Sequence, residues 1–260
     1  MRSNADSACE ICGGKGYIFR KTQHYPDGAQ VQCRCLKRTH AWRKTSALAQ
    51  RSGLDEALLE RYTFDRFHPE AAIADAEGRR AIAEVQAICE RYAARPQGWL
   101  VLSGSYGCGK THLAYAVAGV LLNARRPVYI ASVPQLLQTL REGYDKASRE
   151  EVGDGARALR GQTCEERLAL IQTAGLLILD DLGAEYRTPW VADTLYRIVD
   201  YRYLSKLPLM VTTNVNLRAA QDRIEPRLLS RLLDGAWVEG GWSRVCVLTA
   251  GDYRQRRGVG

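Results

Sequence analysis

Apolar residues along this chain alternate between two patterns, which predict strands and helices in turn. Four short apolar runs are expected to form buried parallel strands, because each is too short for a buried helix. These runs are 99–102, 128–131, 176–179 and 209–211. Helical spacing of apolar residues follows at 112–124 and after Pro134, Pro189 and Pro226. The alternation predicts an open α/β fold, a central parallel sheet flanked by helices, with its site at the carboxyl ends of the strands.

The patterns divide the chain into three predicted parts. Residues 1–45 form a small N-terminal module, residues 46–77 a helical linker, and residues 78–260 the α/β domain. The domain opens with a helix over about 78–94, where apolar residues follow helical spacing. A charged stretch with four glycines, 141–161, is expected to lie on the surface. The chain's 260 residues are enough for one domain of about 200 residues and a small appendage.

Composition narrows the class of protein. Hydrophobic residues make up 46% of the chain, as in a protein with a proper core. No apolar run approaches the ~20 residues of a membrane helix, and the N-terminus lacks the apolar segment of a signal peptide. We therefore expect no membrane partner and a cytoplasmic location, in which the eight cysteines are reduced or bind metal.

The strongest motif follows the first predicted strand. Residues 104–111 read GSYGCGKT, which fits G-x-x-x-x-G-K-[ST] and precedes a predicted helix. Its glycines let backbone N–H groups surround a polyphosphate, and the helix N-terminus adds partial positive charge. Lys110 is expected to reach the β- and γ-phosphates of ATP, and the Thr111 hydroxyl to bind Mg²⁺. The predicted nucleotide-binding residues are Gly104, Ser105, Tyr106, Gly107, Cys108, Gly109, Lys110 and Thr111.

Polar residues end two further predicted strands. Asp180 and Asp181 follow 176–179, and Asn214 follows the next strand. Asp180 is expected to hold Mg²⁺ through water, and Asp181 to orient or activate the water that attacks ATP. Asn214 is a candidate to hydrogen-bond that water or the γ-phosphate, with an ordinary turn residue as the alternative. Glu185 is a lesser candidate for the base.

The helix predicted after Pro226 has an apolar and a basic face. Arg227 and Arg231 lie four residues apart on its polar face. An arginine presented there suits donation to the γ-phosphate of a neighbouring subunit, and an arginine solvated beside its helix is the ordinary alternative. Four leucines are expected to face the core: Leu228, Leu229, Leu232 and Leu233.

Positive charge is concentrated in the N-terminal segment. Residues 1–51 hold ten Lys and Arg against three Asp and Glu, which gives +7 of the chain's +8 and leaves +1 for residues 52–260. A basic end segment suggests nucleic acid or an acidic protein surface as its partner, or else a solvated basic face.

The same segment contains two close pairs of cysteines: Cys9 with Cys12, and Cys33 with Cys35. Four thiolates at this spacing suit a tetrahedral Zn²⁺ site of the structural type, with unligated thiols or iron as alternatives. Short strands are predicted at 17–19 and 29–32 around a turn at 26–28. The metal would replace a core that so short a segment cannot build.

Four motifs in order resemble those of AAA+ P-loop ATPases of the bacterial helicase-loader group, the DnaC and DnaI types, with IstB transposition helpers as close relatives. The motifs are GSYGCGKTHLA, LLILDDLGAE, LYRIVDYRYLSKLPLMVTTN and RLLSRL, and the resemblance covers about residues 60–260, including TFDRF at 63–67. The cysteine-bearing module resembles the zinc-binding, helicase-contacting domain of DnaI-type loaders, which IstB helpers typically lack.

The resemblance implies roles for individual residues. Asn214 matches the sensor-1 residue, Arg231 the arginine finger that acts in trans, and Arg254 the sensor-2 arginine. Asp181 stands where many AAA+ proteins have Glu, which implies a slow ATPase. The chain ends soon after its last predicted strand, so a reduced helical lid is expected.

The function implied is an ATP-dependent loader that binds the replicative helicase and delivers it to single-stranded DNA. ATP would join the subunits of a homo-oligomer, and hydrolysis would release the helicase. Candidate DNA contacts are Lys146, Arg149, Arg157 and Arg160. The alternatives are a transposition helper that binds duplex DNA and activates a transposase, and an adaptor that does not hydrolyse its nucleotide.

Overall fold

A computed structural model describes residues 17–22, 25–32, 56–68, 76–147, 164–185, 188–220, 223–235 and 244–248. Several predicted functional residues lie outside these ranges, so their roles stay predictions. They are the four cysteines at 9, 12, 33 and 35, the arginines at 149, 157 and 160, and Arg254.

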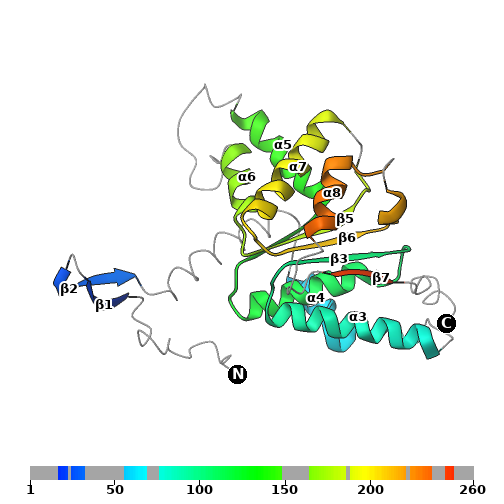
Figure 1. The fold of residues 1–260 in the computed structure, drawn as a ribbon, viewed down its shortest axis with the longest axis horizontal. Coiled ribbons are helices and arrows are strands. Elements are labelled where there is room, and N and C mark those ends of the chain that lie inside the picture. The colour runs from blue at the N-terminus through cyan, green and yellow to red at the C-terminus, as the bar shows by residue number, and fades with distance from the viewer. Residues whose placement is uncertain are drawn as a thin grey trace.

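A five-stranded parallel sheet lies at the centre of the domain, in the order β4-β5-β6-β3-β7 (Figure 1). The strands are β3 (Trp99–Gly104), β4 (Val128–Ser132), β5 (Leu176–Leu182), β6 (Leu209–Thr213) and β7 (Arg244–Leu248). Each predicted apolar run lies in one of them, which confirms the expected α/β fold. The edge strand β7 was not predicted, although residues 245–248 are all apolar; only two of its five residues are buried.

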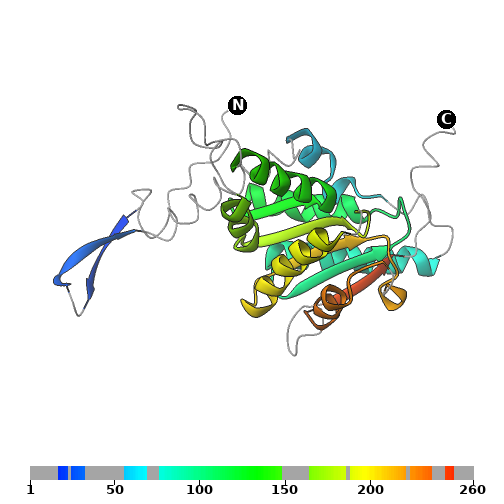
Figure 2. The ribbon, with the colours of Figure 1, turned by 90° about the horizontal axis from the view of Figure 1, so that it is seen from above.

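Helices cover both faces of the sheet (Figures 1 and 2). One face carries α3 (Ala76–Ala94) and α4 (Lys110–Asn123), with the short α2 (Glu56–Arg61) beside α4. The other carries α5 (Val133–Ala147), α6 (Cys164–Gln172), α7 (Pro189–Leu204) and α8 (Pro226–Gly235). Two 3₁₀ turns complete the described elements, η1 (Phe64–Arg66) and η3 (Leu217–Ala219).

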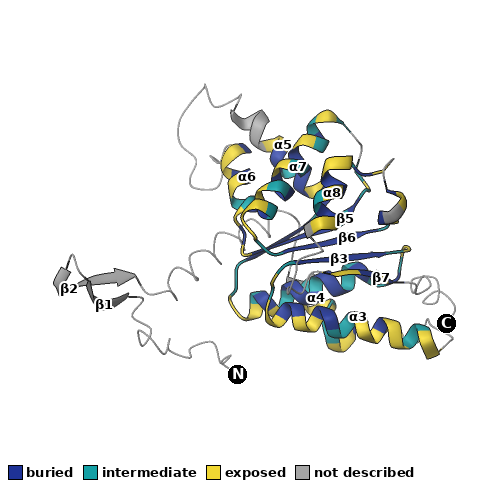
Figure 3. Ribbon diagram, in the orientation of Figure 1, coloured by how far each residue is buried: buried dark blue, intermediate teal, exposed yellow. Residues whose placement is uncertain are grey.

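Each helical layer has its own apolar core against the sheet (Figure 3). Successive residues of a strand point to opposite faces, so Trp99 and Val101 pack with α5–α8, whereas Leu100 and Leu102 pack with α3 and α4. Three of the four leucines of α8 are buried as predicted. The fourth, Leu233, is 42% exposed, contrary to the prediction.

Polar side chains at the start of three helices explain where these helices begin. The Thr188 hydroxyl accepts a hydrogen bond from the Val191 N–H at 3.2 Å, and proline follows at the first position of α7. Glu225 accepts from the Leu228 N–H at 2.8 Å, and Ser132 from the Gln135 N–H at 3.4 Å. The helix begun after Ser132 continues to Ala147, so residues 141–147 are helical rather than part of the predicted surface excursion.

Strands β1 (Tyr17–Thr22) and β2 (Tyr25–Gln32) form a separate antiparallel hairpin that contains both predicted N-terminal strands. The predicted turn at 26–28 is wrong, because these residues lie inside β2. Pairing shifts between Arg20↔Ala29 and Thr22↔Tyr25, which leaves extra residues in β2. Proline cannot donate to a strand ladder and glycine tolerates a bulge, so this sequence interrupts the pairing without ending the strand.

Arg202 of α7 is fully buried and joins three elements of the domain. Its guanidinium donates to the backbone carbonyls of Gln172 at 2.8 Å, of Ala174 at 2.9 Å and of Pro208. These carbonyls lie at the end of α6 and just before β5 and β6. Burial lowers the pKa of Arg202 to about 10, so the side chain keeps its charge at neutral pH.

Replacing Arg202 with Met should lower the free energy of unfolding by about 3 kcal/mol, because several buried carbonyls lose their donor at once. Urea unfolding of the intact chain measures this change. The matched control is Arg197→Met on the same helix, since the Arg197–Glu165 ion pair is 3.4 Å long and exposed. An equal loss in both variants would contradict the structural role given to Arg202.

Candidate nucleotide-binding site

The loop over residues 104–111 joins β3 to α4 and has a backbone shape that requires glycine at three positions. Gly107 and Gly109 have φ values of 74° and 97°, in the left-handed region that favours glycine. A Cβ at Gly104 would collide with the backbone carbonyl of Leu248 in β7. Backbone therefore approaches backbone closely around the loop, as a phosphate cradle at a helix N-terminus requires.

Lys110 is the first residue of α4, and its side chain folds back over this loop. Its Nζ donates to the carbonyl oxygens of Gly104 at 2.9 Å and Ser105 at 2.7 Å, and lies 3.6 Å from the Cys108 sulfur. The residue is only 6% exposed. A buried ammonium held by neutral acceptors gains from an anion brought into the same loop, so its environment fits a phosphate.

Asp180 of β5 connects its own strand to β6 and to the start of helix α4 at the predicted magnesium position. Its Oδ1 accepts hydrogen bonds from the Thr111 hydroxyl at 3.2 Å and the Thr212 hydroxyl at 2.6 Å. Burial raises the pKa of Asp180 above its ordinary value, and the two hydroxyls offset part of this rise. A carboxylate beside a hydroxyl is an oxygen donor set that suits Mg²⁺. Thr111 and Asp180, predicted as a pair from distant motifs, are in direct contact.

A bulge in β5 places Asp181 differently from the prediction. Both acids lie inside the strand rather than after it, and the pairing with β6 shifts between Leu179 and Leu182. Asp181 has a φ of 60°, which is rare for a residue with a side chain and typical of functional sites. The extra residue re-aims its carboxylate, which accepts a hydrogen bond from the Asn214 side-chain amide.

Thr212 connects Asp180 and Asp181, whereas Glu185 is bonded to the loop after β5. Thr212 links both acids, because its hydroxyl also accepts from the Asp181 N–H at 2.9 Å. Its contribution was not predicted, although it lies in the same Thr-Thr-Asn run as Asn214. Glu185 is held by the Gly183 N–H at 2.8 Å, and burial raises its pKa.

The linker segment before α3 docks onto the domain, as its aromatic residues predict, and packs against the first turn of α4. The His112 ring lies between Tyr62 and Phe67, with ring centroids 5.2 and 5.1 Å away, and its Nε2 is 2.7 Å from the Thr63 carbonyl oxygen. A Cβ on Gly109 would lie 2.5 Å from the Phe67 ring. The signal for this contact was the aromatic passage TFDRF.

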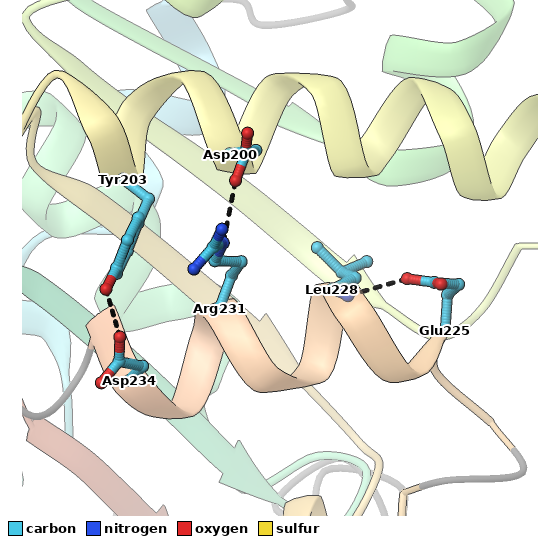
Figure 4. Close-up of polar contacts among 6 residues, drawn as sticks. All are labelled: Asp200, Tyr203, Glu225, Leu228, Arg231 and Asp234. Atoms are coloured by element: carbon cyan, nitrogen blue, oxygen red, sulfur yellow. Dashed lines mark hydrogen bonds and ion pairs between the residues drawn. The ribbon is translucent and has the colours of Figure 1, made fainter.

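Arg231, the predicted trans-acting arginine, contacts α7 of its own chain (Figure 4). Its Nε donates to Asp200 Oδ1 at 2.8 Å, and its guanidinium lies 4.4 Å from the centre of the Tyr203 ring. Arg227 pairs with Glu225 at 2.7 Å. Among the described residues, neither arginine hydrogen-bonds the loop or the two acids, so the structure does not join Arg231 to its own subunit's nucleotide site.

Within the described residues, no group of three or more His, Cys, Asp and Glu side chains is arranged to hold a metal ion. The predicted zinc ligands lie outside that part of the chain. A search of the described helices also finds none long and apolar enough to cross a membrane.

Comparison with known sequences identifies the family. The model of the IstB-like ATP binding protein family matches residues 34–235, which is most of the chain. The chain therefore belongs to the IstB-like ATP-binding protein family.

Curated relatives include helicase loaders. The chain is 26% identical to the uncharacterized protein YdaV of Escherichia coli over 216 residues, 82% of this chain and 79% of YdaV. It is 23% identical to the E. coli replicative helicase loader DnaC over 215 residues, 82% of this chain and 80% of DnaC. A match to the Bacillus subtilis replicative helicase loader DnaI is 31% identical but spans 44% of this chain and 32% of DnaI.

Solved structures show the same fold. A crystal structure of the DnaC helicase loader superposes with a TM-score of 0.53 at 20% identity, over 74% of this chain and 99% of that one. A crystal structure of DnaI gives 0.52 at 22% identity, over 76% and 93%. The likeness shows the same α/β fold and leaves the function to be argued from the site.

The raised pKa of Asp180 predicts an unusual effect of Asp180→Asn. The folded state favours the protonated carboxyl, so the wild type loses stability as pH rises through the raised pKa, and a neutral Asn avoids this loss. The variant should therefore melt higher than the wild type at pH 8 without nucleotide, and the gap should close toward pH 4. In Mg²⁺-ATP the order should reverse, because only the wild type gains from the cation. Thermal unfolding checks both; a lower midpoint for the variant at pH 8 without nucleotide would contradict the argument.

Proposed function

From this family membership and the geometry of the site, we propose that the chain is an ATP-dependent loader that binds the replicative helicase and delivers it to single-stranded DNA. The observation that carries the proposal is the match to DnaC over 80% of the length of that loader. The bonded group of Thr111, Asp180, Asp181 and Asn214 supports an ATP site that hydrolyses as well as binds.

When ATP binds, Lys110 changes its hydrogen-bond partners. Its Nζ leaves the carbonyls of Gly104 and Ser105 for oxygens of the β- and γ-phosphates, and the backbone N–H groups of the loop surround the same oxygens. Thr111 and Asp180 would hold Mg²⁺, which neutralises phosphate charge. The Phe67 ring packs against Gly109 and fixes this end of the loop.

Hydrolysis is assigned to the strained residue of β5. Asp181 orients the attacking water and accepts its proton as the oxygen attacks the γ-phosphorus, while the bond to the β-phosphate oxygen breaks and ADP and phosphate form. The Asn214 amide fixes the direction of the Asp181 carboxylate. The shorter side chain of Asp, compared with Glu, places the base farther from the water and supports a slow rate.

The control of assembly by ATP requires a second subunit. Arg231 of one subunit stabilises the γ-phosphate held by the next, so ATP favours the oligomer and hydrolysis loosens it. The helicase is held by the basic, cysteine-bearing module, with Zn²⁺ as its structural metal. Phosphates of single-stranded DNA bind Lys146, near the end of α5, and the arginines that follow this helix in the sequence, Arg149, Arg157 and Arg160. Arg254 is the candidate sensor-2 arginine.

A transposition helper is the second candidate function, and the family match favours it, because that match is to IstB-like proteins. Such a protein would bind duplex DNA and activate a transposase. The two candidates share the ATP site and differ in partner, so only partner binding separates them.

The partner is tested by co-purification in ATP with a panel of bacterial replicative helicases. The intact chain should retain a helicase, whereas a chain that begins at Gly53 should not, because it lacks the cysteine-bearing module. Lys110→Ala serves as the control for ATP dependence. Binding of duplex DNA by both chains, with no helicase retained by either, would replace the loader with the transposition helper.

Asp181→Asn should retain ATP binding and lose at least 100-fold in phosphate release, because the amide cannot accept the proton. Its Oδ1 still accepts the Asn214 hydrogen bond, so the strand should keep its shape. Glu185→Gln is the matched control and should stay close to the wild-type rate, since that carboxylate is committed to the Gly183 N–H. Unchanged phosphate release in Asp181→Asn would remove Asp181 as the base, whereas no phosphate release from the wild type, with ATP still bound, would support the adaptor alternative.

A further inference from the structure

Helices α7 and α8 meet along a surface seam in which two arginines lie over tyrosine rings. Figure 4 shows one of these pairs, Arg231 and Tyr203. Arg231 of α8 lies 4.4 Å from the centre of the Tyr203 ring and donates through Nε to Asp200. Tyr203 is fixed in turn, because its hydroxyl donates to Asp234 of α8. The guanidinium of Arg231 thus lies over the Tyr203 ring, has a carboxylate at its Nε edge, and also hydrogen-bonds the Tyr196 side chain.

We propose that Asp200 is the positioning residue for Arg231, with Tyr203 as its support, and that together they hold the guanidinium in the orientation in which a neighbouring subunit's γ-phosphate receives it. This inference rests on the proposed function, since it needs Arg231 to act in trans. Asp200 itself touches no substrate.

The nitrogen through which Arg231 binds Asp200 supports a positioning role for Asp200. The hydrogen bond to Asp200 uses Nε, at the base of the guanidinium, and leaves the terminal nitrogens uncommitted to that carboxylate. Those are the nitrogens that bind phosphate in a fork. The Arg231 side chain is 33% exposed, so it can be reached from outside the subunit.

The strength of the ion pair argues against the opposite role, in which Asp200 would hold Arg231 away from phosphate. The side chains of both partners are partly exposed, at 33% and 23%, so water screens their attraction. A pair of this kind cannot compete with a polyphosphate that carries several negative charges. Its effect on geometry is larger, because it limits the many rotamers of a long arginine side chain.

Arg227 provides an internal comparison. It lies one turn earlier on α8, pairs with Glu225 at 2.7 Å and lies 4.6 Å from the centre of the Tyr196 ring. Its side chain is 61% exposed, and its acidic partner is two residues away in the same chain segment. Arg231 differs because its partner belongs to another helix, which fixes its direction relative to the domain.

The test measures steady-state ATP hydrolysis and ATP affinity in full-length variants. Asp200→Ala should lower kcat about 10- to 100-fold with an ATP Kd close to that of the wild type. Asp200→Asn should lose less, since its Oδ1 still accepts from Nε. Arg231→Ala should lose at least as much as Asp200→Ala, and Arg227→Ala should stay close to the wild type.

Mixed oligomers then distinguish a misplaced arginine from a damaged fold. Asp181→Asn subunits bind ATP and carry an intact Arg231, so mixing them with Asp200→Ala subunits should restore hydrolysis at the Asp200→Ala nucleotide sites. Wild-type hydrolysis in Arg231→Ala would overturn the trans arginine of the proposed function. Loss in Arg231→Ala, together with wild-type or faster hydrolysis in Asp200→Ala, or with no rescue of Asp200→Ala, would overturn the positioning role alone.

Discussion

Burying the carboxylate of Asp180 is the constraint on which the site depends. A carboxylate away from water is costly unless hydrogen bonds or a cation compensate it. Here two threonine hydroxyls do so, one from the start of α4 and one from β6, so the acid fixes three elements at one point. The rise of its pKa shows that this compensation is incomplete. Burying Asp180 therefore lowers the stability of the folded state, but it leaves the carboxylate where a divalent cation can bind it.

Asp181, the neighbouring acid, also lowers stability, in its case through an unfavourable backbone conformation. Asp181 adopts a left-handed conformation because β5 carries one residue more than β6 at this point. Two adjacent residues of a regular strand point to opposite faces, so two acids in sequence could not both serve one site. The bulge resolves this conflict by re-aiming one of them, and the Asn214 amide holds the result.

Much of this arrangement was predictable from local sequence. Apolar runs located four of the five strands, and the glycine loop and the two acids located the site. The bulge was not predictable, because it depends on the register between strands. The same limit applies to Arg231 and Asp200, which lie 31 residues apart and meet only after α7 and α8 have packed. The contact of Phe67 with Gly109 likewise depends on tertiary structure, so TFDRF was assigned to a linker.

The contact between Phe67 and Gly109 shows that the ATP-binding unit begins before α3. Phe67 is 5% exposed and belongs to the apolar core shared by α3 and α4, so the segment over 62–67 is part of the folded unit. Its ring fills the space that any side chain at position 109 would need. Position 109 is therefore restricted to glycine for two reasons, the Phe67 ring and the left-handed φ of 97° at this residue. A shortened chain that starts at α3 would expose the first turn of α4 and lose one wall of the phosphate loop.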